Sequence, residues 1–219
     1  LYSCNSKVIS CEPCGDKFNI VLDRTVFFPT GGGQLCDKGE IDDKSVCDVY
    51  INNDEIIHVC SAPVEIDKTV GVSINREMRF DHMQQHTGEH LLSYAFWHLF
   101  GAVNVGFHMN EQFCTIDLDR PVSKEQLNAA ESFANAQVFE NHPVRTYEIT
   151  LDDMQKLSAR KKTDKAHGMV RVVNIDGSDV CTCCGTHTSH TGEVGIIKII
   201  GSFKHKDGVR LTFLCGNRA

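Results

Sequence analysis

The pattern of apolar residues changes at about residue 75, and this change divides the 219-residue chain into two parts. Between residues 17 and 74 the apolar runs are short, as in FNIVL, TVFF, GEI, VCDVYI and IIHVC, and Gly, Asn and Asp separate them. Such runs predict the strands of a small antiparallel sheet or barrel. From Arg76 to Gly101 the apolar residues follow a helical period instead. We therefore expect a β domain over residues 1–75 and an α+β domain over residues 76–219.

The second part of the chain alternates helical and strand patterns without the regular spacing of βαβ units. Ser123 and Gln126 have the spacing of a capping box, and the residues after them are rich in helix formers, which predicts a second helix. The runs VRTYEIT and MVRVVNI are typical of strands, and LDDMQKLSARKK between them is typical of a short helix. Lys206-Asp207-Gly208 lies between two β-rich runs and predicts a hairpin.

Composition excludes several classes of protein. No apolar run approaches the roughly 20 residues that span a bilayer, and the N-terminus lacks a signal-peptide pattern, so we expect a cytoplasmic protein without a membrane partner. The net charge of -7 argues against non-specific coating of nucleic acid, because such binding sums Lys and Arg contacts with phosphates. Eleven cysteines cannot all pair, and disulfide scaffolds are normally much shorter, so reduced thiols with some bound to metal fit better.

Three histidines recur every four residues within the first helical pattern: His82, His86 and His90. Each step of four residues overshoots a full turn by about 40°, so only neighbouring histidines face the same way. Two imidazoles on one helix face can provide half of a tetrahedral zinc site. The sequence therefore predicts that two of these three histidines bind one metal ion.

The run CTCCGTHTSH, residues 181–190, places three cysteines and two histidines close together. Thiolate and imidazole ligands suit zinc. Buried structural cysteines are the alternative interpretation, which explains Cys181 or Cys184 well but the adjacent His187 poorly. A Cys/His pair from this run, joined to two histidines of the helix, would complete a set of four ligands.

Three further features allow more than one interpretation. The glycine run in FFPTGGGQ lacks the Lys-Ser/Thr of a P-loop, so it is either a turn between strands or a close backbone approach to a ligand, beside the amide of Gln34. The basic run from Arg160 to Lys165 is either a solvated surface or a phosphate contact. Cys11 and Cys14 have metal-ligand spacing, but no second CxxC lies at a matching distance, so we expect ordinary thiols there.

The segment HTGEH also matches H-x-x-E-H, the inverted zinc-protease pattern, in which Glu89 would be the general base. That function needs a third ligand from a downstream helix, and Glu131 is the candidate. The Cys/His pair of the later run already fills the remaining positions, which argues against a protease. Gly88 is also unfavourable in a helix unless something must approach it closely.

Four separated motifs resemble the editing domain of alanyl-tRNA synthetases and the freestanding AlaX proteins. HTGEHLL resembles their H-x-x-x-H motif, and CCGTH followed by TGEVG resembles their C-x-x-x-H motif. FFPTGGGQLCDKG resembles the preceding glycine-rich segment, and RFDHMQQHTGEHLLS and FLCGNRA also read like AlaX sequences. The resemblance implies an α+β protein: an N-terminal small glycine-rich β-barrel domain followed by an α/β editing domain of the threonyl/alanyl-tRNA synthetase second-domain type.

The resemblance also implies an activity and the residues that serve it. The activity is hydrolysis of alanine tRNA mischarged with serine or glycine, by a freestanding protein or by an editing fragment of a full alanyl-tRNA synthetase. One zinc ion would be held by His86, His90, Cys183 and His187. The expected contacts with tRNA are Thr30, Gly31, Gly32, Gly33 and Gln34, to which we add Arg160, Lys161 and Lys162 from the basic run.

The substrate bond is an ester to a terminal ribose, and its hydrolysis needs an activated water and a stabilised oxyanion. Zinc can activate a bound water, or it can hold the aminoacyl group while another residue handles the water. Four protein ligands are typical of structural zinc, so we expect the holding role. The candidates for handling the water are His82, Glu89 and His108. The missing side chain of Gly88 is expected to leave room beside the metal for the end of the charged tRNA. A non-catalytic, zinc-stabilised tRNA-binding module is the remaining alternative.

Overall fold

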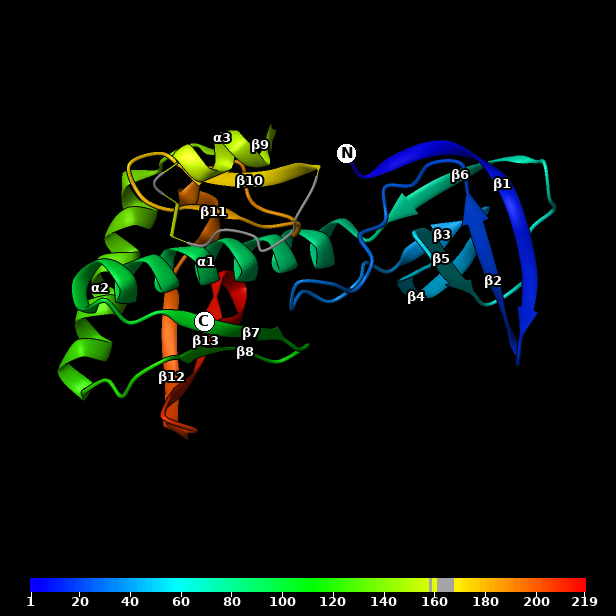
Figure 1. The fold of residues 1–219 in the computed structure, drawn as a ribbon. Helices are drawn as coiled ribbons and strands as arrows, with labels where there is room; N and C mark the ends of the chain where they lie inside the picture. The colour runs from blue at the N-terminus through cyan, green and yellow to red at the C-terminus, as the bar shows by residue number, and fades with distance from the viewer. Residues whose placement is uncertain (158, 161–167) are drawn as a thin grey trace. The chain divides into compact units, whose positions relative to one another are not determined.

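The computed structural model describes residues 1–157, 159–160 and 168–219, and it contains two compact units, Leu1–Phe80 and Asp81–Ala219 (Figure 1). The division falls inside the first helix, α1 (Arg76–Phe100), a few residues after the change in apolar pattern. The guanidinium of Arg79, in the first turn of α1, binds both carboxylate oxygens of Asp37. This ion pair explains why the start of α1 belongs with the first unit.

The first unit is a closed antiparallel barrel, as expected from the sequence. Its strands are β1 (Ser3–Cys14), β2 (Lys17–Leu22), β3 (Gly39–Ile41), β4 (Lys44–Asn52), β5 (Glu55–Cys60) and β6 (Thr69–Ile74). They pair in the order β1-β2-β5-β4-β3-β6, and β6 pairs with β1 to close the barrel. Inward side chains such as Val8, Ile20 and Val72 form its core.

Two parts of the barrel differ from the expectation. The run TVFF, residues 25–28, was expected to be a strand, but it lies in the loop between β2 and β3. There the backbone N–H of Phe28 donates to the carboxylate of Asp37 (2.6 Å) instead of to a neighbouring strand. β1 was not expected. Its inward positions include Ser6 as well as Val8, and with a polar residue facing inward the apolar and polar residues do not alternate regularly along the strand.

The second unit combines helices with two sheets among its described residues. Its helical segments, besides most of α1, are α2 (Lys124–Glu140), α3 (Leu151–Lys156), η1 (Thr191–Val194) and η2 (Gly216–Arg218). One sheet has the order β11-β10-β9, formed by β9 (Val144–Thr150), β10 (Met169–Ile175) and β11 (Val180–Thr182). The other has the order β12-β13-β8-β7, formed by β7 (Asn104–Met109), β8 (Cys114–Leu118), β12 (Ile197–His205) and β13 (Gly208–Cys215).

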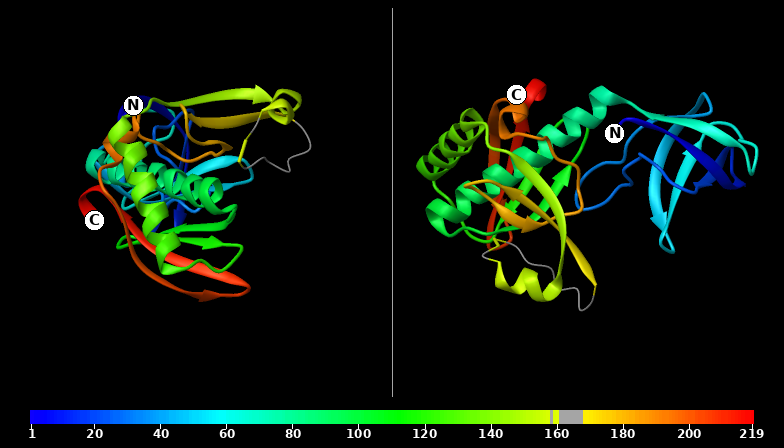
Figure 2. Two further views of the ribbon diagram at one scale, coloured as in Figure 1. Left: turned by 90° about the vertical axis from the view of Figure 1, so that its left-hand side faces the viewer. Right: turned by 90° about the horizontal axis from the view of Figure 1, so that it is seen from above.

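Helix α1 runs through the middle of the second unit, with the two sheets on opposite sides (Figures 1 and 2). On one side, the amide of Gln85 donates to the carbonyl of Cys215 (2.8 Å) and accepts from its N–H (2.9 Å) at the end of β13. On the other side, His90 binds Asp179, which directly precedes β11. Residues 84–93 of α1 are all buried. Side chains of α1 can therefore meet residues from both layers.

Most of the elements predicted in the second part are confirmed. Ser123 and Gln126 form the capping box of α2, with each side chain accepting from the other residue's backbone N–H (3.3 and 2.8 Å). The hairpin at the C-terminal end turns through Lys206 and Asp207, between β12 and β13. Among the described residues, none of the helices combines the length and the apolar character needed to cross a lipid bilayer.

Candidate metal centre

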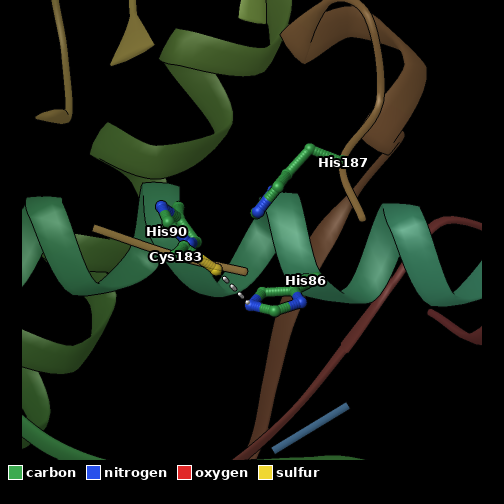
Figure 3. A group of neighbouring side chains, drawn as sticks. All are labelled: His86, His90, Cys183 and His187. Carbon is green, nitrogen blue, oxygen red and sulfur yellow. Dashed lines mark hydrogen bonds between the residues drawn. The ribbon is translucent and has the colours of Figure 1, made fainter. Parts of the chain in front are cut away.

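Four side chains from two distant segments converge in the second unit. His86 and His90 lie one turn apart on α1, and Cys183 and His187 come from the loop that follows β11 (Figure 3). One potential ligand atom from each lies within 4.8 Å of those of the other three. The Sγ atom of Cys183 is 3.3 Å from Nε2 of His86, close to the roughly 3.5 Å between two ligands of a tetrahedral zinc ion. The structure thus brings together the four residues expected to bind zinc.

The donor atoms of this cluster fit a metal ion. Nε2 of His187 is buried and has no hydrogen-bond partner among the described residues, and a buried polar atom of this kind is costly unless something binds it. Burial lowers the pKa of His187 to about 3, so its ring is neutral and offers a lone pair. Burial alone would raise the pKa of the Cys183 thiol, but the surrounding imidazoles outweigh burial and hold that pKa far below its usual range. A thiolate beside the neutral imidazole of His187 offers the sulfur and nitrogen donors that zinc prefers.

Hydrogen bonds hold the loop after β11 in shape, tie it to β10 and join it to α1. The backbone N–H of Gly185 donates to Sγ of Cys183 (3.3 Å), and the guanidinium of Arg171 donates to the carbonyl of Cys183 (2.6 Å). The hydroxyl oxygen of Thr87 lies 3.3 Å from Nδ1 of His187 and accepts from the backbone N–H of Thr188 (3.0 Å). These bonds hold the two loop ligands in place against the two helix ligands.

His90 has a second set of buried neighbours. Its Nδ1 lies 3.1 Å from Oδ2 of Asp179 and 3.3 Å from Sγ of Cys181. Asp179 also accepts two hydrogen bonds of 2.8 Å from the guanidinium of Arg160. Burial alone would raise the pKa of Asp179, but Arg160 and His90 outweigh it and hold that pKa well below its usual range. Asp179 was not among the residues expected at the site. Its position two residues before Cys181 was the one signal in the sequence that could have indicated it.

The basic run does not have the role expected for it where the structure describes it. The side chain of Arg160 is only 5% exposed and is committed to Asp179, so it does not present its charge to an external phosphate. The expectation of a phosphate contact at Arg160 is corrected on this ground. Lys161 and Lys162 lie outside the described residues.

Glu89 is buried beside the cluster. Its Oε1 accepts from the hydroxyl of Ser93 (2.6 Å) and from the side-chain amide of Asn104 (2.7 Å). Its Oε2 lies 3.7 Å from Nε2 of His90. Glu89 therefore combines a fixed orientation with a position next to a potential metal ligand.

The other two candidates for handling water lie in different surroundings. His82 is buried on α1 one turn before His86, and it is not one of the four clustered residues. His108 is exposed on β7, next to Phe107, whose ring contacts that of His86 with 5.1 Å between centroids. Successive side chains of a strand point to opposite faces, so the structure does not bring His108 to the cluster.

The expectation for Gly88 was wrong. A Cβ atom at this position would lie 2.2 Å from Sγ of Cys215 and 3.3 Å from a methyl group of Val194. Gly88 therefore faces β13 and η1 rather than the cluster. Its missing side chain lets α1 pack closely on β13 and leaves no room there for tRNA.

The glycine run forms a tight turn in the first unit. Gly31 and Gln34 exchange two backbone hydrogen bonds (3.1 and 3.0 Å), and Gly32 and Gly33 between them have φ of 60° and 83°. Positive φ at both central positions of a two-residue turn favours glycine strongly. The backbone N–H of Thr30 donates to the carbonyl of Val49 (2.9 Å), which ties the turn to β4. The turn interpretation thus explains the central glycines without a ligand.

The ligand sets considered as alternatives do not form among the described residues. Glu131, the third ligand that a protease would need, accepts instead from the ammonium of Lys198 (2.7 Å) and the N–H of Ile199 (2.6 Å). It belongs to neither potential metal group of the described chain. Cys11 and Cys14 also belong to neither of these two groups.

The chain is similar in sequence to several known proteins. Residues 170–211 match the family described as the threonyl and alanyl tRNA synthetase second additional domain, a segment that includes Cys183 and His187. Over 96% of its length, the chain is 38% identical to alanyl-tRNA editing protein Aarsd1 of Rattus norvegicus, of which it covers 55%. It is 34% identical to alanyl-tRNA editing protein AlaX-L of Pyrococcus horikoshii, covering 98% of this chain and 55% of that protein. It is also 34% identical, over 97% of its length, to a quarter (25%) of the alanine–tRNA ligase of Ignicoccus hospitalis. The chain spans about half the length of the editing proteins that it matches.

Proposed function

Because this chain is a homologue of the alanyl-tRNA editing proteins, we propose that it hydrolyses mischarged alanine tRNA in trans. In this proposal the substrate is the ester of serine or glycine with the terminal ribose, and one zinc ion is held by His86, His90, Cys183 and His187. A protein that acts on charged tRNA would work in the cytoplasm. An editing fragment of an alanyl-tRNA synthetase is the alternative, since the chain also resembles a quarter of such a ligase.

The convergence of the four ligands carries this proposal. They come from α1 and from the segment that matches the synthetase domain, and they lie within 4.8 Å of one another around the orphaned Nε2 of His187. Zinc at this point would supply a positive charge that holds the aminoacyl group or stabilises its developing oxyanion. The chain's own residues must then receive the proton of the attacking water and position the tRNA end.

We propose that Glu89 is the general base that accepts the proton of the attacking water. Its carboxylate lies beside His90, and Ser93 and Asn104 fix its orientation through Oε1, which leaves Oε2 for the water. His82 is the second candidate because it is buried on the same helix. For the tRNA we propose Thr30, Gln34 and the glycines between them as contacts, in addition to their role in the turn.

Deacylation assays test the proposed activity. Serine-charged and glycine-charged alanine tRNA should be hydrolysed faster than the correctly charged alanyl form, and a generic peptide should not be cleaved. Cys183→Ala should lower both bound zinc and deacylation. Full activity of zinc-depleted protein would overturn the role of the metal. Binding of tRNA without any hydrolysis would leave a non-catalytic module instead.

Substitution of Glu89 tests its assigned role. Glu89→Gln preserves the size of the side chain and the hydrogen bond from Ser93, but it removes the base. We expect kcat to fall by roughly 10²- to 10⁴-fold, the usual contribution of general base catalysis, while zinc content stays unchanged. Metal analysis and single-turnover deacylation measure the two effects. Unchanged kcat would exclude Glu89 as the base and direct the same experiment to His82.

A further inference from the structure

The buried ion pair of Arg160 and Asp179 lies against His90, where Asp179 contacts the ring nitrogen Nδ1. We propose that Arg160 and Asp179 are positioning residues that hold His90 in the tautomer and orientation needed to bind the metal ion. This inference rests on the proposed function, because it assumes that the four-residue cluster binds zinc. Neither residue would touch the substrate or the metal.

The contacts of Asp179 support this role. Nδ1 of His90 lies 3.1 Å from Oδ2 of Asp179, and an ionised carboxylate can only accept, so Nδ1 carries a proton and Nε2 is the nitrogen that remains to bind a metal ion. A carboxylate bound to the remote nitrogen of a metal-ligating histidine fixes the ring and raises its basicity. The side chain of Asp179 is 0% exposed, so its charge needs a buried partner.

Arg160 is the buried partner of Asp179, and its backbone is in turn bonded to the residue after Asp179. Its guanidinium donates to both oxygens of Asp179 (2.8 Å each), and its own N–H donates to the carbonyl of Val180 (2.8 Å). Asp179 directly precedes β11, Val180 is the first residue of this strand, and Cys183 follows directly after it. The ion pair thus ties a ligand on α1 to the strand that carries the ligands of the loop.

The same contacts exclude a different use of these residues. His90, Asp179 and Cys181 also form a group that could hold a metal ion. The guanidinium of Arg160 already occupies both oxygens of Asp179, and it would repel a divalent cation at close range. We therefore infer one ion at the four-residue cluster and a supporting role for Asp179.

Zinc affinity, measured by competition with a chromogenic chelator, tests the inference. Asp179→Asn should weaken zinc binding by about 10- to 100-fold, the usual effect of losing such a supporting carboxylate. Cobalt-loaded protein should show an altered visible spectrum, because the geometry around the ion changes. Asp117→Asn is the matched control, since Asp117 accepts two hydrogen bonds from Arg210 (2.5 and 2.6 Å) on the other sheet. It should leave the affinity and the spectrum unchanged.

A second variant guards against loss of folding. The double substitution Arg160→Met with Asp179→Asn removes both charges together, and neutral replacement of a buried pair is often tolerated. It should fold and still bind zinc about 10- to 100-fold more weakly than the wild type. If wild-type protein binds zinc and both variants match its affinity and cobalt spectrum, the positioning role is overturned while the metal site stands. If the wild type binds no zinc, the metal site and this inference both fail.

Discussion

Buried histidines in the two units show how single residues acquire different roles. In the barrel, Nδ1 of His58 donates to the carbonyl of Ile20 (3.0 Å), and its Nε2 accepts from the hydroxyl of Thr25 (2.9 Å). Both nitrogens are satisfied, so His58 is a structural residue. In the second unit, Nε2 of His187 has no such partner within the described chain and lies among other atoms that could bind a metal ion. The second ring nitrogen, bonded in His58 and without a partner in His187, therefore distinguishes the structural histidine from the proposed metal ligand.

The burial of His58 predicts a pH dependence of stability. Burial lowers the pKa of His58 below its ordinary value, so the unfolded state binds its proton at a higher pH than the folded state does. The contribution of neutral His58 is complete above about pH 6.5 and is lost as pH falls from there toward the lowered pKa. Urea unfolding of the barrel between pH 7.5 and 5 measures this loss. His58→Gln, which cannot titrate, should lose less stability over this range; an equal loss would contradict the assignment.

At the scale of elements, the middle of α1, residues 84–93, is buried because both sheets of the second unit pack against it. Its contact with β13 depends on two residues: Gln85 satisfies the backbone of Cys215, and Gly88 allows the close approach. Its contact with the other layer runs through the four residues of the proposed metal site and through Asp179. The positions of His86 and His90 therefore depend on these contacts, because they fix where α1 lies.

Substitution of Gly88 tests the packing of α1 on β13. Gly88→Ala places a methyl group 2.2 Å from Sγ of Cys215, and such overpacking costs about 1–3 kcal/mol. The gain in helix propensity offsets about 1 kcal/mol of this cost. We expect a lower free energy of urea unfolding. In a Cys215→Ala background the sulfur is gone, so the same substitution should be neutral or stabilising. A similar loss in both backgrounds would show that the contact with Cys215 is not the cause.

At the scale of the whole molecule, the cluster links segments that lie far apart in sequence. Metal binding would join α1 to the loop after β11 within the second unit, whereas the barrel of the first unit has its own closed core. A ligand that binds only the folded state stabilises that state by mass action. The effect of zinc on stability should therefore be confined to the unit that holds the cluster.

Removal of zinc tests this separation. Trp97 is the only tryptophan of the chain and lies on α1 in the second unit, so its fluorescence reports the unfolding of that unit. A strong chelator should lower the melting temperature seen by Trp97 by several degrees, because about 1 kcal/mol shifts Tm by about 2–8 °C in domains of this size range. Cys183→Ser should show the lower temperature without chelator and no further change with it. A chelator effect of equal size in Cys183→Ser would contradict binding at this site.

Local sequence determined the elements whose signals are contained in a few neighbouring residues. The capping box at Ser123 and Gln126, the turn after His205 and the histidine pair of α1 could all be predicted, because hydrogen bonds and helix geometry act over three or four residues. The spacing of Cys183 and His187 also indicated a metal site, although only the fold could bring the two pairs together.

Tertiary structure decided the features that depend on contacts between distant segments. The backbone N–H of Phe28 donates to Asp37 and not to a neighbouring strand, and Arg160 is buried because it pairs with Asp179. Gly88 faces Cys215 instead of the metal ligands. In each case the partner lies at least nine residues away in the chain. The energy of burying a charge or of packing two surfaces depends on what lies across the contact, and the local sequence does not contain that information.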